Sequence, residues 1–378
     1  MKIVYLDNAA TSHPKPECVY RAAERCMRYE CGNPGRGAHP LSLAAANGIY
    51  SCREKICMLF GASSCEDVAF FSSDTAALNA VIKCALRPGD NMLISEAEHN
   101  SVRRPALSLK RCGVDVRTYR AFCPEDETMS DIASKVDCRT KMICAVHQSN
   151  ICPLTLPVKK IGEFCRRRGI LFLVDIAQSA GHTEVDMRSL CADALCAPGH
   201  KGLFGLQGTG FAVLSENMKK ALLSSPTLIE GGSGINSRDE AMPSVFPERL
   251  EAGTLNTPGI FALGAGIDYI NNVGIGAIEA HERELYLLAR EMLMNTRGIK
   301  LYMSECSGGS ILLFNKVKRD CEEVAAALAD DGICVRAGLH CAPTAHDAIG
   351  SGGAVRVSVG AFNTKRDIER FALALSKI

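Results

Sequence analysis

Short apolar runs alternate with helical patterns from about residue 16 to residue 255. The runs lie at Val68–Phe71, Asn91–Ser95, 141–146 and 170–175. The last three are continuous rather than alternating, which is typical of parallel strands covered on both faces. This order of elements predicts a mostly parallel α/β sheet built from βαβ units.

One helix is predicted between the last two of these runs. Pro157 suits the first turn of a helix, and Gly169 follows three arginines as a C-terminal stop. The apolar residues between them recur at helical spacing, at positions 158, 161, 164 and 165. A helix of this length between two buried strands supports the βαβ interpretation.

The pattern changes beyond about Pro258. Two long helices, near 260–272 and 279–296, lead to short strands near 309–315 and Ala354–Ser358. This pattern indicates a separate α+β unit.

The chain closes with a helix that begins at Thr364, where Asp367 completes a capping box. We therefore predict a large α/β domain over residues 16–257. Residues 1–15 and 258–378 are predicted to form a smaller α+β domain.

Composition and charge narrow the class of protein. A chain of 378 residues is long enough for about two domains. Lys and Arg number 43 and Asp and Glu 42, so the net charge of +1 offers no argument for nucleic acid or an anionic membrane as partner. No apolar run reaches the ~18 residues of a membrane span, and the first residues lack the pattern of a signal peptide. We expect a cytoplasmic protein.

The 19 cysteines are scattered, and no two are spaced as C-x-x-C. This argues against a metal site and against a disulfide framework. Most lie in apolar contexts and are interpreted as small buried hydrophobes in a reducing compartment. Examples are Cys84, Cys144, Cys165 and Cys196.

Two charged residues follow predicted strands. Asp175 ends the run at 170–175, at the strand edge where ligands bind in open α/β sheets, although it could simply cap the next helix. Lys201 follows the apolar run 192–197, and taken alone it could be a solvated loop residue. A strand-end carboxylate followed by a lysine on a later strand-end loop is what a pyridoxal phosphate site requires.

These residues carry a family resemblance. The stretch 175–178 followed by 199–201 resembles the signature of class V aminotransferase-fold enzymes, and within them the chain most resembles the cysteine desulfurases. The resemblance implies a fold-type I transferase that carries pyridoxal 5'-phosphate. Further matching stretches lie in order along nearly the whole chain, at 5–11, 32–36, 72–79, 98–101, 251–254 and 355–364.

The resemblance implies roles around the cofactor ring. Lys201 holds the cofactor as a Schiff base and later moves the Cα proton of the substrate. Asp175 keeps the pyridine nitrogen protonated. Gln178 hydrogen-bonds the phenolic oxygen, and His99 stacks on the ring and shuttles protons.

The resemblance also implies which residues hold the phosphate and the substrate. Thr75 and the backbone amides at the start of the next helix bind the phosphate. His200 adds a donor, and Thr254 reaches the same phosphate from the other subunit of a homodimer.

The substrate carboxylate is gripped by Arg356 through two hydrogen bonds, with help from Asn150. Asn8, in the first matching stretch, is also assigned to substrate binding.

The sequence departs from the family pattern at several positions. Asp74 stands where relatives usually have Thr or Ala, and Ala76 where they have Glu. A carboxylate at Asp74 would repel a phosphate unless it points away. Pro198 replaces a Ser or Thr that donates to the phosphate in many relatives, and Gly35 and Gly37 loosen the segment after Asn33.

Cys341 is the cysteine whose neighbours suggest chemistry. It lies in a loop containing Gly and Pro, with Arg336 and His340 close in sequence as cations that favour a thiolate. The surrounding residues match the desulfurase pattern R-x-G-x-H-C-A, which implies that Cys341 takes the sulfur of L-cysteine as a persulfide, leaves L-alanine, and passes the sulfur to an acceptor protein. The alternative is that Cys341 is one more buried cysteine without a chemical role.

Three other functions stay open. A selenocysteine lyase acting on L-selenocysteine would use the same site. An aminotransferase of the same fold would not need Cys341. A non-catalytic scaffold gains some weight from Asp74, Ala76 and Pro198.

Overall fold

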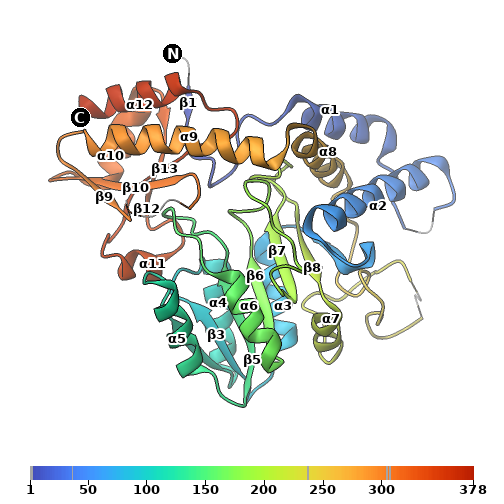
Figure 1. Ribbon diagram of the computed structural model, residues 1–378. Helices are drawn as coiled ribbons and strands as arrows, with labels where there is room; N and C mark the ends of the chain where they lie inside the picture. The colour runs from blue at the N-terminus through green and yellow to red at the C-terminus, as the bar shows by residue number, and fades with distance from the viewer. Residues whose placement is uncertain (1–2, 36, 236–237, 304, 306–307) are drawn as a thin grey trace.

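The computed structural model describes residues 3–35, 37–235, 238–303, 305 and 308–378, so Arg36 of the matching stretch 32–36 lies outside the described residues. A seven-stranded sheet forms the centre of the molecule (Figure 1). Its strands are β2 (Val68–Phe71), β3 (Asn91–Ser95), β4 (Asp115–Tyr119), β5 (Thr140–Val146), β6 (Leu171–Asp175), β7 (Ala194–Pro198) and β8 (Gly210–Leu214).

The strands lie in the order β2-β8-β7-β6-β5-β3-β4. The pairs from β4 through β7 are parallel, whereas β8 runs antiparallel to both of its neighbours. The predicted mostly parallel α/β sheet is therefore confirmed. Each predicted strand in this region is present, with its ends within two residues of the predicted ones. The largest difference is at β7, which begins at Ala194 although the apolar run begins at Ala192.

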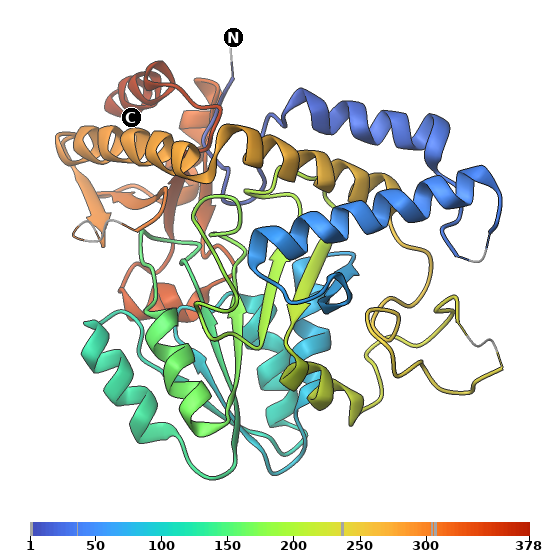
Figure 2. The ribbon, with the colours of Figure 1, turned by 45° about the vertical axis from the view of Figure 1, so that its right-hand side comes forward.

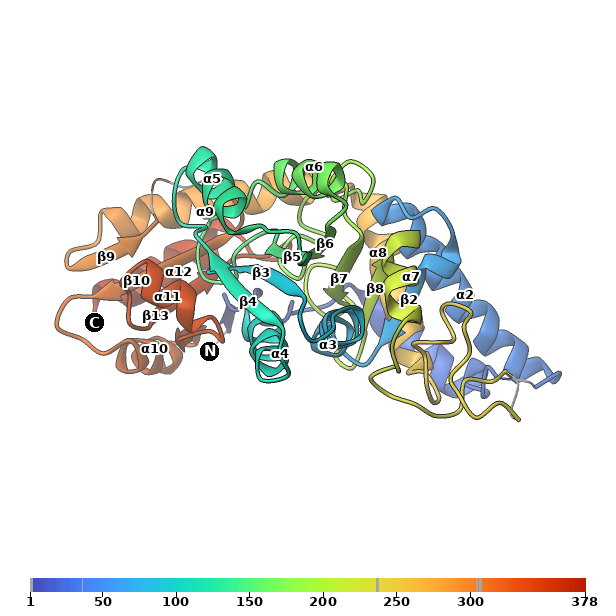
Figure 3. The same cartoon turned by 90° about the horizontal axis from the view of Figure 1, so that it is seen from below.

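Helices cover both faces of this sheet (Figure 3). The helices of this part of the chain are α1 (Glu17–Arg25), α2 (Pro40–Phe60), α3 (Asp74–Ala85), α4 (Asn100–Lys110), α5 (Glu125–Lys135), α6 (Val158–Arg168), α7 (Glu216–Leu223) and α8 (Thr257–Val273), with a π-helical turn at Cys26–Glu30 and a 3₁₀ turn at Cys65–Asp67. Helix α1 packs on α8 rather than on the strands. The predicted helix after Pro157 is α6, and Gly169 ends it in the left-handed conformation.

Alternate residues of each strand point to opposite faces and so enter different cores. Phe172 packs in the core covered by α1, α2, α5, α6 and α8. Its neighbour Leu173 packs in the core covered by α3, α4 and α7. Burial on both faces explains why these strands are continuously apolar in the sequence.

The C-terminal part forms a four-stranded antiparallel sheet, in the order β12-β13-β10-β9. The chain's N-terminal strand also joins this region, because β1 pairs in parallel with β11. The elements are β1 (Val4–Tyr5), α9 (Ile275–Met294), β9 (Ile299–Tyr302), β10 (Ile311–Lys316), α10 (Cys321–Asp330), β11 (Ile333–Cys334), β12 (Arg336–Gly338), α11 (Pro343–Ala348), β13 (Ala354–Ser358) and α12 (Lys365–Ser376).

The predicted capping box of α12 is present, with Thr364 and Asp367 bonded reciprocally. Helix α8 packs along α1 and α2, and its Ile260 and Ile267 belong to the core of the large sheet (Figure 2). The domain boundaries at 15 and 257 remain a prediction.

Among the described residues, we find no helix with the length and apolar character needed to cross a bilayer. The same part of the chain holds no group of three or more His, Cys, Asp or Glu side chains placed to bind a metal ion.

Candidate active site

A cavity of about 220 Å³ lies where the carboxyl ends of β5, β6 and β7 face the C-terminal sheet. The starts of α3 and α4 close it on one side, and residues of β12, β13 and the loop after β12 close it on the other. Nine of the eleven predicted site residues line this cavity. They are Thr75, His99, Asn150, Asp175, Gln178, His200, Lys201, Cys341 and Arg356.

Asp175 and Lys201 come from neighbouring strand ends. Asp175 is the last residue of β6, and one of its carboxylate oxygens accepts a hydrogen bond of 2.9 Å from the Ala177 amide. Burial raises the pKa of Asp175 and lowers that of Lys201, while the attraction between the two groups opposes both shifts. A lowered pKa increases the share of Lys201 in the neutral amine form, which is the form that attacks a carbonyl carbon.

His99 begins α4 and its tautomer can be assigned. Its Nδ1 accepts a hydrogen bond of 3.1 Å from the Ser101 amide, which caps the helix. Burial, together with the positive charge of Lys201, lowers the pKa of His99 to about 4. The ring is therefore neutral with its hydrogen on Nε2.

Gln178 and His200 are both anchored to the N-terminal segment. The Gln178 side-chain amide donates to the carbonyl of Ala9 at 3.0 Å, which leaves its second N–H hydrogen for a ligand. Nδ1 of His200 lies 3.0 Å from the hydroxyl of Thr11. Burial lowers the pKa of His200 to about 4, so the ring is neutral.

The phosphate position predicted from the sequence lies at the start of α3. Ser73 caps this helix, and Asp74 and Thr75 are its first two residues. Free backbone amides and the helix dipole favour an anion at such a position. Asp74 also lines the cavity, and its buried Oδ1 has no hydrogen-bond partner among the described residues.

Arg356 is buried and already holds two partners. One guanidinium nitrogen donates to Asp7 at 2.7 Å and the other to the carbonyl of Asn150 at 2.9 Å. Each of these nitrogens keeps a second hydrogen, so a carboxylate in the cavity can still be bound. Asp7 was not identified as a site residue from the sequence, and Arg336, which lines the same end of the cavity, was identified only as a cation near Cys341. Their position in the matching motifs was the only available signal.

The loop that carries Cys341 is held in an unusual conformation. His340 and Cys341 both have positive φ, at 49° and 57°. Such backbone costs ~1–3 kcal/mol per residue and persists only where the surroundings enforce it. Here they do, because the His340 carbonyl accepts from the Asn150 side chain at 2.8 Å and the Cys341 carbonyl accepts from the Asn100 amide at 2.7 Å. The large sheet thereby fixes a loop of the C-terminal part.

A chain of hydrogen bonds fixes the tautomer of His340. Its Nε2 lies 3.3 Å from the carbonyl of Arg336, which can only accept, so Nε2 carries a hydrogen. Burial lowers the pKa of His340 to about 3, so the ring is neutral and Nδ1 must accept from Nε2 of His346 at 3.1 Å. Nδ1 of His346 then accepts from the Ser351 hydroxyl at 2.5 Å.

The sequence-based expectation that His340 lends positive charge to Cys341 is therefore wrong. A buried imidazole with this hydrogen-bond chain is neutral, and its ring is engaged with Arg336 and His346. The cations at this end of the cavity are the guanidinium groups of Arg336 and Arg356.

Asn8 and Thr254 do not line the cavity. The Asn8 amide donates to Ser358 and Asn363, so it ties the N-terminal segment to the C-terminal part. The structure thus gives no support to a contact between Asn8 and substrate.

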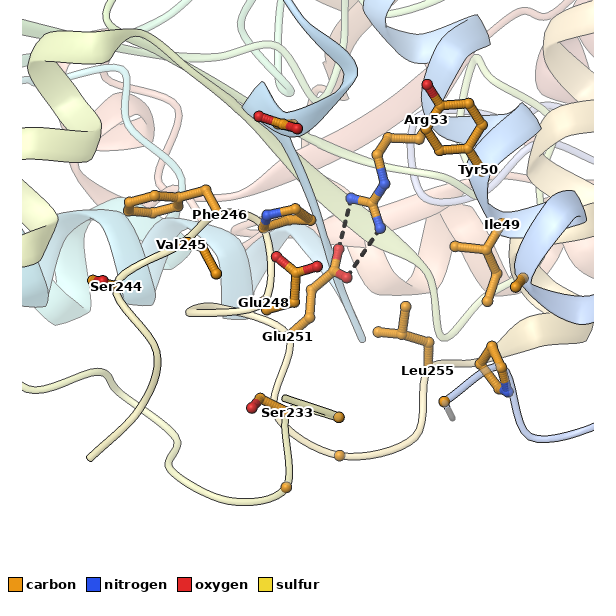
Figure 4. A pocket seen from close by; sticks show the side chains of 18 of the residues that line it. Ile49, Tyr50, Arg53, Ser233, Ser244, Val245, Phe246, Glu248, Glu251 and Leu255 are labelled. Atoms are coloured by element: carbon orange, nitrogen blue, oxygen red, sulfur yellow. Dashed lines mark hydrogen bonds and ion pairs between the residues drawn. The ribbon is translucent and has the colours of Figure 1, made fainter. Parts of the chain in front are cut away.

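Thr254 is exposed and lies on a larger cavity of about 1070 Å³. The buried ion pair between Arg53 and Glu251, at 2.8 Å, anchors the loop that carries Thr254 (Figure 4). Glu251 also accepts from the Phe70 amide at 2.7 Å. Thr254 is thus held firmly at the molecular surface, away from the cavity of its own chain.

The residues present fit pyridoxal phosphate. Lys201 offers an amine, Asp175 a free carboxylate oxygen for a pyridinium nitrogen, and His99 a neutral ring for stacking. Thr75 and the first amides of α3 offer donors for a phosphate. Asp74, beside Thr75 in the cavity wall, is a further polar residue, and its buried Oδ1 lacks a hydrogen-bond partner among the described residues.

Comparison with known proteins defines the class. The family model for aminotransferase class V matches residues 4–371. The chain belongs to this family, which confirms the resemblance seen in the sequence.

Two similar proteins indicate a more specific class of enzyme within this family. The chain is 37% identical over 381 residues to a probable cysteine desulfurase of Methanothermobacter thermautotrophicus, covering 99% of this chain and 94% of the relative. It is 31% identical to a cysteine desulfurase of Salmonella dublin, covering 100% and 94%.

Two solved structures of cysteine desulfurases are also similar to this chain. The apo cysteine desulfurase of Thermococcus onnurineus superposes with a TM-score of 0.90 at 30% identity, covering 99% of this chain and 94% of that one. The S-sulfonic acid form of an Escherichia coli cysteine desulfurase gives a TM-score of 0.89 at 26% identity, with the same coverage.

Proposed function

We propose that this chain is a pyridoxal phosphate-dependent cysteine desulfurase that converts L-cysteine to L-alanine and holds the released sulfur as a persulfide on Cys341. The observation that carries the proposal is that Cys341 and Lys201, which are 140 positions apart in the chain, line one cavity. Both a lysine for the cofactor and a thiol for the sulfur are then within reach of one substrate.

Substrate binding is assigned to the arginine end of the cavity. Arg356 binds the carboxylate of L-cysteine through the hydrogens that Asp7 and Asn150 leave free. The carboxylate and the thiol of cysteine are on adjacent carbons of one small molecule. Binding the carboxylate at Arg356 therefore directs the substrate sulfur toward the loop of Cys341.

Proton movement at Cα is assigned to Lys201. Pyridoxal phosphate, when bound, supplies an electron sink that stabilises negative charge at the Cα of the substrate. Lys201 removes the Cα proton and returns one, because its lowered pKa favours the neutral amine that can accept a proton. Asp175 keeps positive charge on the pyridine nitrogen, and His99 packs on the ring.

Sulfur transfer is assigned to Cys341. Its thiol loses a proton, and the thiolate attacks the substrate sulfur, which forms an S–S bond and breaks the bond between Cβ and sulfur. The electron pair of the broken bond stays with Cβ, which takes up a proton and becomes the methyl group of alanine. The outer sulfur keeps its hydrogen, so the thiol of Cys341 ends as a persulfide.

Two rival reactions use the same cavity. A selenocysteine lyase would act on L-selenocysteine with the same residues. An aminotransferase would not use Cys341 in its reaction. The exposure of residue Cys341 favours sulfur transfer, because a persulfide has to be delivered to an acceptor protein.

The active unit is proposed to be a homodimer. Thr254 can serve a phosphate only in another subunit, since it lies outside its own chain's cavity. Exposed apolar residues surround its loop, as expected of a surface that is covered in an assembly. They include Tyr50, Leu223, Leu228, Ile229 and Val245. A cytoplasmic location remains an expectation.

The test adds L-cysteine, L-selenocysteine, or L-alanine with a keto acid to the holoprotein and to Cys341→Ala. We expect alanine from L-cysteine with the parent protein, and its loss in Cys341→Ala. Alanine from L-selenocysteine alone would favour the lyase. Amination of the keto acid by both proteins would favour the aminotransferase.

A further inference from the structure

Asp74 is a buried acid with an unpartnered oxygen in the wall of the cofactor cavity. It is the first residue of α3, it is 8% exposed as a residue, and it lines the cavity beside Thr75. Its Oδ1 is buried and has no hydrogen-bond partner among the described residues. A buried acceptor without a donor costs ~1–3 kcal/mol, which calls for a ligand that satisfies it.

The surroundings of Asp74 disfavour its negative charge. Burial raises the pKa of Asp74 well above its ordinary value, and the nearby carboxylate of Asp175 at the end of β6 raises it further. Lys201, after β7, acts in the opposite direction, and Cys196 on β7 is a further titratable group that feels the Asp74 charge. The other titratable or charged groups that line the cavity are His99, His200, Arg336, His340, Cys341 and Arg356.

An anionic ligand at the start of α3 makes ionisation still harder. A phosphate bound by Thr75 and the α3 amides would lie beside Asp74, and two negative groups in a buried site repel strongly. A protonated carboxyl instead has an O–H donor. It would replace the hydroxyl donor that Pro198 cannot supply.

We propose that Asp74 binds the cofactor phosphate as a neutral carboxylic acid, donating its O–H hydrogen to a phosphate oxygen, so that cofactor affinity falls as pH rises. This inference rests on the proposed pyridoxal phosphate site and adds a positioning residue to it. Oδ1 and Oδ2 are equivalent by rotation, so the orphaned oxygen becomes the donor when it carries the proton.

The experiment titrates apoprotein with pyridoxal phosphate and, separately, with pyridoxal, from pH 6 upward. Both compounds react with Lys201 alike, so effects of its ionisation are common to the two titrations. Affinity is measured for the parent protein and for Asp74→Asn, whose neutral amide donates at every pH. The ratio of the two dissociation constants for pyridoxal phosphate should rise by up to about tenfold per pH unit, while the ratio for pyridoxal should stay flat.

Two variants guard against misfolding and general charge effects. Asp74→Thr keeps a hydroxyl donor that does not titrate, and it should show the flat profile of Asp74→Asn. Asp126→Asn removes an exposed acid from the first turn of α5 and should behave as the parent protein.

Two results overturn the inference while leaving the cofactor assignment intact. They are identical pH profiles for the parent protein and Asp74→Asn, or a ratio that rises equally with pyridoxal. If neither protein forms a coloured complex with pyridoxal phosphate, the proposed function fails, and this inference fails with it.

Discussion

Nδ1 of His340 lies 3.1 Å from Nε2 of His346, and the two rings are stacked with an angle of 16° between their planes. The hydrogen bonds run in one direction, from Ser351 through His346 to His340 and the carbonyl of Arg336. This neutral chain ends on His340, whose backbone is left-handed like that of Cys341. Its role is to hold the loop, since neither ring carries a charge.

Replacing His346 removes the Nε2–H group that donates to His340. The change should therefore displace Cys341 without affecting cofactor binding. We expect His346→Leu to lower kcat for L-cysteine by roughly 10- to 100-fold, because small misplacements of a reacting group have effects of this size. KM and the affinity for pyridoxal phosphate should change little. Steady-state kinetics and cofactor titration measure both.

The matched variant is His346→Gln, whose amide nitrogen can still donate to His340. It should restore most of the lost kcat. Equal losses in the two variants would show that the hydrogen bond does not position the loop.

Arg356→Lys should raise KM for L-cysteine by roughly 10- to 100-fold, because a lysine cannot hold Asp7, the Asn150 carbonyl and a carboxylate together. The absorbance of bound pyridoxal phosphate should be unchanged. Arg366→Lys, on the exposed side of α12, serves as the control. A drop in melting temperature with an unchanged KM would mean that Arg356 only anchors Asp7.

Glu98 predicts a pH dependence of stability. This buried acid accepts from the Val146 amide at 2.8 Å, and burial raises its pKa from 4.5 to about 8. Between these values the folded protein keeps a proton that the unfolded chain releases, so stability falls as pH rises, by about 1.4 kcal/mol per pH unit from this group.

Glu98→Gln removes that contribution. Relative to the parent protein, its free energy of unfolding in urea should improve steadily from pH 5 to pH 8. Glu323→Gln, an exposed change on α10, should show no such trend. A constant difference across this range would contradict the raised pKa of Glu98.

The proposed dimer predicts complementation between subunits. In a hybrid of Lys201→Ala and Thr254→Ala chains, one site has both residues intact, since its Lys201 and its Thr254 come from different chains. Mixing the two variants should therefore restore activity. A mixture of Lys201→Ala and Cys341→Ala should stay inactive, because both residues belong to one cavity. No gain in the first mixture would place Thr254 outside the partner's site.

Much of the fold follows from local patterns. Burial on both faces makes the strands of the large sheet continuous apolar runs, and caps such as Thr364 and Gly169 mark where helices begin and end. The antiparallel direction of β8 was not predicted, because strand direction depends on tertiary connections that periodicity does not encode.

The candidate site likewise combines relationships that the sequence predicts with others that it does not. Asp175 and Lys201 follow strand ends, so their meeting could be expected from βα topology. The pairing of Arg356 with Asp7 joins residues 349 positions apart, and the neutrality of His340 depends on burial and on His346. Neither the pairing of Arg356 with Asp7 nor the neutrality of His340 can be predicted from the local sequence. Asn8 matched a family stretch, yet its amide serves the backbone.

The most direct test of the account locates the sulfur. Holoprotein is given one equivalent of L-cysteine, and its peptides are mapped by mass spectrometry without reductant. We predict one added sulfur atom on the peptide that contains Cys341, an equal amount of alanine, and neither product in Cys341→Ala. Alanine released without sulfur on Cys341, or sulfur found on another cysteine when Cys341 is replaced, would contradict this prediction.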